Sequence, residues 1–132
     1  MGFVLDASIA ACWILPDEHN AKADISLDAL ENARASVPEI WDYEVRNLLI
    51  VNERRGRISA DATASGLAFL STLPIDIARN AHMEAILDVA RRHRLTFYDA
   101  AYLELAMRKK MPLATLDSAL IAAVRAAGIE LL

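Results

Sequence analysis

Residues 3–15 read FVLDASIAACWIL. The run Phe3-Val4-Leu5 is short and wholly apolar, which predicts a strand that is buried on both faces and ends at Asp6. The segment from Ala7 to Leu15 predicts a short helix, and Pro16 ends it because proline cannot continue a helix. A buried strand that passes directly into a helix is typical of a βαβ unit, so this stretch indicates an α/β fold.

The rest of the chain repeats this alternation. Further strands are predicted at Val37, Pro74–Ile77, Leu113–Leu116 and Ile129–Leu132. Further helices are predicted over Glu18–Ala33, Glu39–Arg55, Ser59–Ser71, Asn80–His93 (with Asn80 as the cap), Phe97–Lys110 and Ser118–Ala127. Right-handed crossovers then give a three-layer α/β/α sandwich with a central, mostly parallel sheet. A length of 132 residues fits one domain, so one domain over residues 1–132 is expected.

Composition excludes several classes of protein. Hydrophobic residues make up 55% of the chain and charged residues 24%, which fits a globular core rather than a low-complexity chain. Cys12 is the single cysteine, so neither an intramolecular disulfide nor a cysteine-based zinc site is expected. No apolar run reaches the roughly 20 residues that span a bilayer. The apolar start carries Asp6 and lacks a basic leader, so a cytoplasmic location and no membrane partner are expected.

Two aspartates follow predicted strands. Asp6 comes directly after Phe3-Val4-Leu5, and Asp117 comes directly after Leu113–Leu116. In open parallel sheets ligands bind beyond the carboxyl ends of the strands, so both carboxylates are candidates for a site at that edge. The alternative for each is a helix N-cap, a position that aspartate favours.

Glu44 interrupts an apolar stripe on its predicted helix. It lies three residues after Trp41 and four before Leu48, which places it on or beside the face that points to the core. Such conflicts between local pattern and fold tend to occur at functional sites. The alternative is a structural ion pair with Arg46 or Arg94.

Asp99 begins another predicted helix. Its spacing from Thr96 is that of a capping box, so a purely structural role stays open. The small residues Ala100, Ala101 and Ala106 would let this helix approach the sheet closely and bring Asp99 near the strand ends.

Together the four carboxylates predict a metal site. Anions held a few ångströms apart repel, and a hard divalent cation such as Mg²⁺ or Mn²⁺ relieves that repulsion with oxygen ligands. The three histidines are scattered and offer no competing zinc set. Carboxylate-bound metal of this kind supports phosphodiester hydrolysis, in which one carboxylate can also orient the attacking water.

Four stretches resemble the PIN-domain ribonucleases, and specifically the VapC-type toxins of VapBC toxin–antitoxin pairs. In chain order they are Val4-Leu5-Asp6-Ala7-Ser8 with Trp13–Glu18, Pro38–Asn47, Tyr98–Ala106 and Leu113–Asp117. The resemblance covers the whole chain, and the sequence keeps all four acidic positions.

The resemblance implies a metal-dependent endoribonuclease. It assigns metal binding to Asp6, Asp99 and Asp117, completion of the acidic site to Glu44, and support of the site to Ser8 and Thr115. It also implies an RNA substrate, often a structured one such as tRNA, a cognate VapB-like antitoxin and a homodimer. Candidate RNA contacts are Arg46, Arg54-Arg55-Arg57, Arg91–Arg94 and Lys109-Lys110, although each could instead complement a helix dipole.

Other functions stay open at this point. One is a PIN-fold nuclease that acts on DNA or in RNA processing, and another is a non-catalytic PIN module that only binds a partner. A receiver-like signalling module also uses an acidic pocket, but it usually carries a late lysine after a strand. Here that position reads Thr115-Leu116-Asp117, which counts against it.

Overall fold

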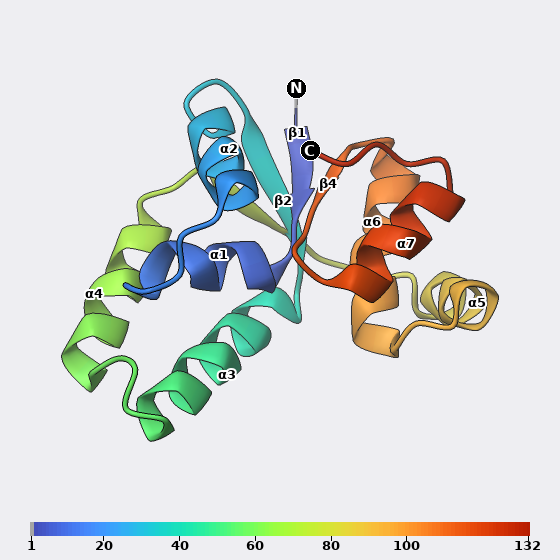
Figure 1. Cartoon of the computed structure of the whole chain (residues 1–132). Coiled ribbons are helices and arrows are strands. Elements are labelled where there is room, and N and C mark those ends of the chain that lie inside the picture. Colours follow the sequence, from blue (N-terminus) through green and yellow to red (C-terminus); the bar gives the residue numbers. More distant parts are fainter. Residues whose placement is uncertain (1) are drawn as a thin grey trace.

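The computed structural model describes residues 2–132, which form a four-stranded sheet flanked by seven helices (Figure 1). The strands are β1 (Gly2–Leu5), β2 (Arg34–Pro38), β3 (Ile75–Ala78) and β4 (Leu113–Ala114). The helices are α1 (Ala7–Ile14), α2 (Ala21–Ala29), α3 (Trp41–Arg54), α4 (Ala60–Ser71), α5 (Met83–His93), α6 (Phe97–Lys109) and α7 (Ser118–Ala126). Each neighbouring pair of strands is parallel, so the predicted α/β fold is confirmed.

The sheet has the strand order β3-β2-β1-β4. Helices α1 to α4 lie on one side of it and α5 to α7 on the other, which is the predicted three-layer arrangement (Figure 1). The chain moves to one side of β1 to form β2 and β3, and later returns to the other side to form β4. Such a reversal of strand order marks the place where ligands bind in open α/β sheets.

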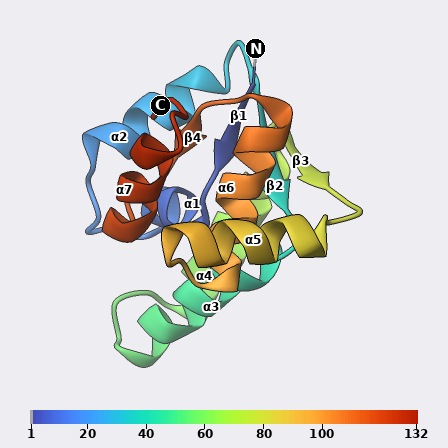
Figure 2. The ribbon, with the colours of Figure 1, turned by 90° about the vertical axis from the view of Figure 1, so that its right-hand side faces the viewer.

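The core explains why α6 reaches the strand ends. Val4 and Leu5 of β1 are fully buried, as are Ala100 and Ala106 of α6. Because these alanines are small, α6 packs directly on β1, β2 and β4, while α5 covers its outer side (Figure 2). On the other face of the sheet Gly66 of α4 lies so close to Ile14 that any side chain at this position would collide with it.

Two predicted helix starts are wrong. Helix α2 begins only after Asn20, whose side chain caps it by accepting bonds from the N–H groups of Lys22 at 2.8 Å and Ala23 at 3.3 Å. Asn20 therefore offers a stronger start than the predicted Glu18. Asn80 does not cap α5, because its backbone is left-handed with φ of 62°, and the helix begins after His82.

The predicted C-terminal strand over residues Ile129–Leu132 is also wrong. This segment touches the sheet through a single bridge between Leu131 and Leu113. Strand β4 itself is shorter than predicted, because the chain leaves the sheet at Thr115, whose hydroxyl bonds to the Asp6 carboxylate.

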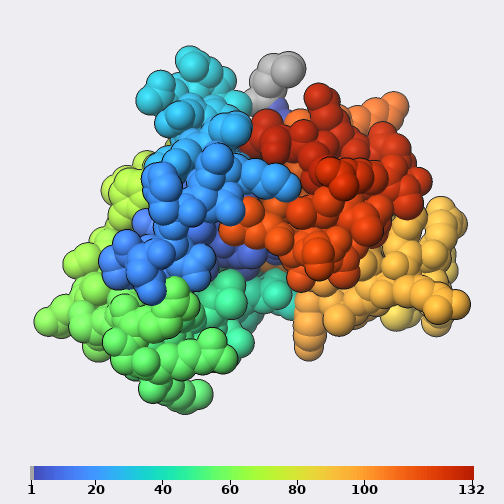
Figure 3. Space-filling view, viewed as in Figure 1, coloured from blue at the N-terminus to red at the C-terminus, as the bar shows by residue number. Residues whose placement is uncertain are grey.

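The two ends of the described chain come together on one face. In the space-filling view the N-terminal helices, in blue, lie against the C-terminal part, in red (Figure 3). The start of β1 and the C-terminus both lie at the edge of the sheet opposite the carboxyl ends of the strands (Figure 1). Within residues 2–132 no helix combines the length and the apolar composition that crossing a membrane requires.

Candidate active site

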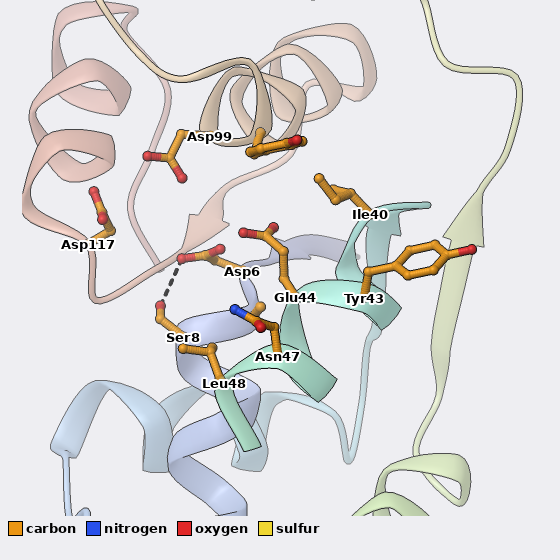
Figure 4. A pocket seen from close by; sticks show the side chains of 11 residues that line it. Asp6, Ser8, Ile40, Tyr43, Glu44, Asn47, Leu48, Asp99 and Asp117 are labelled. Atoms are coloured by element: carbon orange, nitrogen blue, oxygen red, sulfur yellow. Dashed lines mark hydrogen bonds between the residues drawn. The ribbon is translucent and has the colours of Figure 1, made fainter. Parts of the chain in front are cut away.

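One cavity at the carboxyl edge of the sheet collects all four carboxylates singled out in the sequence. Asp6 enters it from the end of β1, Glu44 from α3, Asp99 from α6 and Asp117 from the segment after β4 (Figure 4). The cavity has a volume of about 580 Å³. Residues more than a hundred positions apart in the chain thus meet where the strand order reverses.

Asp6 is the most buried of the four. Only 5% of its surface is exposed, and its Oδ2 accepts bonds from the Ser8 hydroxyl at 2.8 Å and the Thr115 hydroxyl at 2.6 Å. The bond from Ser8 is drawn in Figure 4. Within the described α1, the Asp6 side chain makes no capping bond, so the N-cap alternative does not hold for this residue.

The two hydroxyls that bind Asp6 also position Asp117. The Thr115 hydroxyl accepts a bond from the Asp117 N–H at 3.0 Å, and the Ser8 hydroxyl accepts one from the Leu116 N–H at 3.1 Å. Asp117 does cap α7, since its Oδ1 accepts a bond from the Leu120 N–H at 2.9 Å. The capping role and the place at the cavity therefore coexist in Asp117.

Glu44 extends from α3 toward Asp6 and Asp99 (Figure 4). It is half-buried, and its Oε1 accepts a bond of 2.7 Å from the hydroxyl of Tyr102. The alternative of an ion pair with Arg46 or Arg94 does not hold among residues 2–132, since neither arginine pairs with Glu44 and Arg46 instead pairs with Asp42 one turn earlier on the same helix. The hydrogen-bond partner of Glu44 is therefore the neutral side chain of Tyr102, not an arginine.

Asp99 lies in the first turn of α6, as the capping spacing predicted. The Thr96 hydroxyl accepts a bond from the Asp99 N–H at 3.1 Å and caps the helix. Burial, together with the charges of Asp117 and Asp6, raises the pKa of Asp99 from 3.8 to about 6. The capping residue is therefore Thr96, which leaves the Asp99 carboxylate at the cavity.

The cavity concentrates negative charge that no neighbouring cation offsets. Burial raises the pKa of Asp6 and of Glu44, and the charge of Asp117 adds to both effects. Hydrogen bonds from Thr115 and Ser8 lower the pKa of Asp6, and the bond from Tyr102 lowers that of Glu44, so both partly offset the effect of burial. The described residues that line the cavity include no Lys, Arg or His. The site therefore favours the binding of positive charge.

Sequence reasoning missed other residues around the cavity. Tyr43 and Tyr98 form part of its lining and keep 77% and 57% of their surfaces exposed, and Asn47 also lines it. Each stands next to a carboxylate in the sequence or one helical turn after it. Tyr102 follows Asp99 by three positions on α6, so helical spacing was the signal that could have placed it on the same face.

The predicted basic contacts lie mainly at helix ends. Arg54 is in the last turn of α3, Arg91 to His93 close α5, and Lys109 closes α6. Arg57 is held by Asp17 at 2.9 Å and Glu18 at 3.1 Å. These positions suit the helix-dipole alternative, and an RNA contact at any of them stays a prediction.

This fold and its acidic cavity are those of a PIN domain, and the chain belongs to the PIN-domain family, whose model matches residues 3–126. The chain is 30% identical to Ribonuclease VapC3 of Pyrobaculum aerophilum over 120 residues, which cover 89% of this chain and 90% of that protein. The resemblance inferred from the four sequence motifs is thereby confirmed.

Solved structures have the same fold. The crystal structure of PAE2754 from Pyrobaculum aerophilum matches with a TM-score of 0.72 and 26% identity, over 93% of this chain and 87% of that one. A chain of VapBC2 from Rickettsia felis, solved bound to a DNA fragment from their promoter, matches with a TM-score of 0.68. It is 17% identical and covers 100% of this chain and 98% of that one, so it supports the fold alone.

Proposed function

We propose that residues 1–132 act as one PIN domain that hydrolyses RNA phosphodiester bonds with a divalent metal, Mg²⁺ or Mn²⁺. The observation that carries this proposal is the convergence of Asp6, Glu44, Asp99 and Asp117 in a single cavity. The match to Ribonuclease VapC3 over most of both chains supports RNA as the substrate. The chain would act as the toxin of a type II toxin–antitoxin pair.

The donor set fits a hard divalent cation. All four side chains offer oxygen ligands, and burial together with the neighbouring carboxylates raises the pKa of three of them, Asp6, Glu44 and Asp99. Within residues 2–132 no three acidic, His or Cys side chains form a group that could hold an ion unaided. The carboxylates instead surround a wide cavity, which suits Mg²⁺ because this ion keeps several waters among its ligands.

Each residue has a distinct proposed role. Asp6, Asp99 and Asp117 would hold the metal, and the bonds from Ser8 and Thr115 keep the Asp6 carboxylate in place. A metal bound there would lower the pKa of its water and stabilise charge on the phosphate oxygens. Glu44 would orient the attacking water and accept its proton, a role that its raised pKa favours.

Partners are proposed on the basis of the structural neighbours. One of these is a toxin–antitoxin complex from Klebsiella pneumoniae and another is VapBC2 from Rickettsia felis, which supports a VapB-like antitoxin as the partner of this chain. A homodimer is proposed as well. Tyr43 and Tyr98 line the cavity with large, exposed rings that such a partner could cover.

The proposed activity has a direct test. Purified protein is incubated with total RNA and Mn²⁺, and the new 5′ ends are mapped. We expect discrete new ends that disappear with EDTA and return when Mg²⁺ or Mn²⁺ is added in excess. Single-stranded and duplex DNA are tested in parallel, since cleavage of DNA but not RNA would support the alternative nuclease. No cleavage of either polymer with either metal would reject the proposal in favour of a non-catalytic PIN module.

A further inference from the structure

Tyr102 links the two outer layers of the fold at the candidate active site. It is fully buried on α6, one helical turn after Asp99. Its hydroxyl donates a 2.7 Å bond to Oε1 of Glu44, which belongs to α3 on the other side of the sheet. The two residues are 58 positions apart in the chain, so this contact exists only in the folded domain.

The Tyr102 hydroxyl stays protonated and therefore always acts as the hydrogen-bond donor to Glu44. Burial, aided by the charges of Asp6 and Glu44, raises the pKa of Tyr102 far above its usual value of 10.0. The hydroxyl therefore keeps its proton at every pH at which the protein would work. Because a phenol carries one proton, the whole donor capacity of Tyr102 goes to Glu44.

The bond also restricts how Glu44 can orient. Glutamate has three rotatable side-chain bonds, and among residues 2–132 Tyr102 is the one side chain that hydrogen-bonds its carboxylate. With Oε1 fixed by Tyr102, Oε2 is the oxygen left for the cavity. A phenylalanine would fill the same volume, so packing alone does not account for a hydroxyl buried at this position.

We propose that Tyr102 is a positioning residue that holds the Glu44 carboxylate in the orientation the cleavage reaction requires. This inference rests on the proposed function of the cavity. It adds a residue to the site that touches neither the reacting phosphate nor the metal and acts only through Glu44.

The test is the variant Tyr102→Phe, which removes the hydroxyl and keeps the ring. Loss of a group that orients an active-site side chain typically costs about 10-fold, so kcat for a defined RNA should fall by about that factor. KM should stay within about twofold of wild type, because substrate binding is not affected. In a Glu44→Gln background the same change should alter kcat by less than about twofold, because coupled residues are not additive.

A control variant distinguishes an effect on the orientation of Glu44 from a general loss of protein stability. Ser26→Ala also removes a buried hydroxyl group. This hydroxyl donates a 2.9 Å bond to the Lys22 carbonyl within α2, a helix that does not line the cavity. The variant should keep the wild-type kcat, because Ser26 belongs to α2 and not to the candidate active site. A wild-type kcat in Tyr102→Phe, or an equal loss in the Glu44→Gln background, would overturn the inference.

Binding of Mn²⁺, followed through the electron paramagnetic resonance of the free ion, keeps the two proposals apart. A wild-type protein that binds Mn²⁺ but cuts no RNA would contradict the proposed function. In a wild-type protein that does cut RNA, Tyr102→Phe should bind Mn²⁺ within about twofold of wild type, because Glu44 is not among the proposed metal ligands. A loss of Mn²⁺ binding that matches the loss of kcat would contradict the positioning role. A protein that neither binds Mn²⁺ nor cuts RNA would contradict both.

Discussion

Replacing Asp6 by asparagine is expected to lower the rate of RNA cleavage by about 10³-fold, which corresponds to about 4 kcal/mol of lost transition-state stabilisation. Asp6 is the most buried of the four carboxylates and is fixed by two hydroxyls, so it is the best-oriented candidate metal ligand. Asparagine keeps the shape but loses the negative charge. The measurement is the initial rate of cleavage of a defined RNA at saturating Mn²⁺.

This loss should occur in a folded protein. Burial disfavours the charged form of Asp6, so a neutral side chain at this position should leave the metal-free melting temperature unchanged or raise it. The matched control is Asp42→Asn, which removes an exposed carboxylate paired with Arg46 on α3 and should keep wild-type activity. Wild-type cleavage by a pure Asp6→Asn variant would contradict the assignment.

The metal-free protein is expected to lose stability as the pH rises through the range in which Asp99 ionises. The ordinary pKa of an aspartate is 3.8 and that of Asp99 in the folded protein is about 6, so between these values the folded state holds a proton that the unfolded state has lost. Stability falls with pH wherever the folded state binds more protons. Asp6 and Glu44, whose pKa values are also raised, contribute in the same direction.

Thermal unfolding in EDTA at a series of pH values tests this expectation. The melting temperature of Asp99→Asn should exceed that of wild type by a margin that grows from about pH 4 to about pH 6, the interval bounded by the two pKa values. Metal at about 100 times its Kd should restore about 2.7 kcal/mol to wild type, or roughly 10 °C for a domain of this size. A margin that shrinks with rising pH would contradict the raised pKa of Asp99 that burial and the neighbouring carboxylates produce.

The sequence was sufficient to locate the edge of the sheet where the site lies. Asp6 and Asp117 follow strands, and parallel strands present their carboxyl ends together, so their convergence followed from the fold class. Glu44 was detectable because a charged residue on an apolar stripe conflicts with burial. For Asp6, Asp117 and Glu44, a local sequence pattern and the general rule of α/β topology were enough to predict a place at the site.

The side-chain contacts within the site were beyond the reach of the sequence. The bond between Tyr102 and Glu44 depends on how α3 and α6 pack across the sheet edge, and no local pattern encodes that distance. For Thr115 the family resemblance implied a supporting role, but not its contacts: the hydroxyl donates to Asp6 and accepts from the Asp117 N–H. Asn80 was misassigned because its preference for caps equally suits the left-handed backbone that it adopts.

Whether the carboxylates of the cavity hold a divalent metal is tested most directly by locating Mn²⁺ through its anomalous scattering in crystals of the wild-type protein. Mn²⁺ is expected inside the cavity, where Asp6, Asp99 and Asp117 would hold it directly or through water. Crystals that bind Mn²⁺ only at surface carboxylates such as Asp42, and leave the cavity without an ion at saturating Mn²⁺, would contradict it.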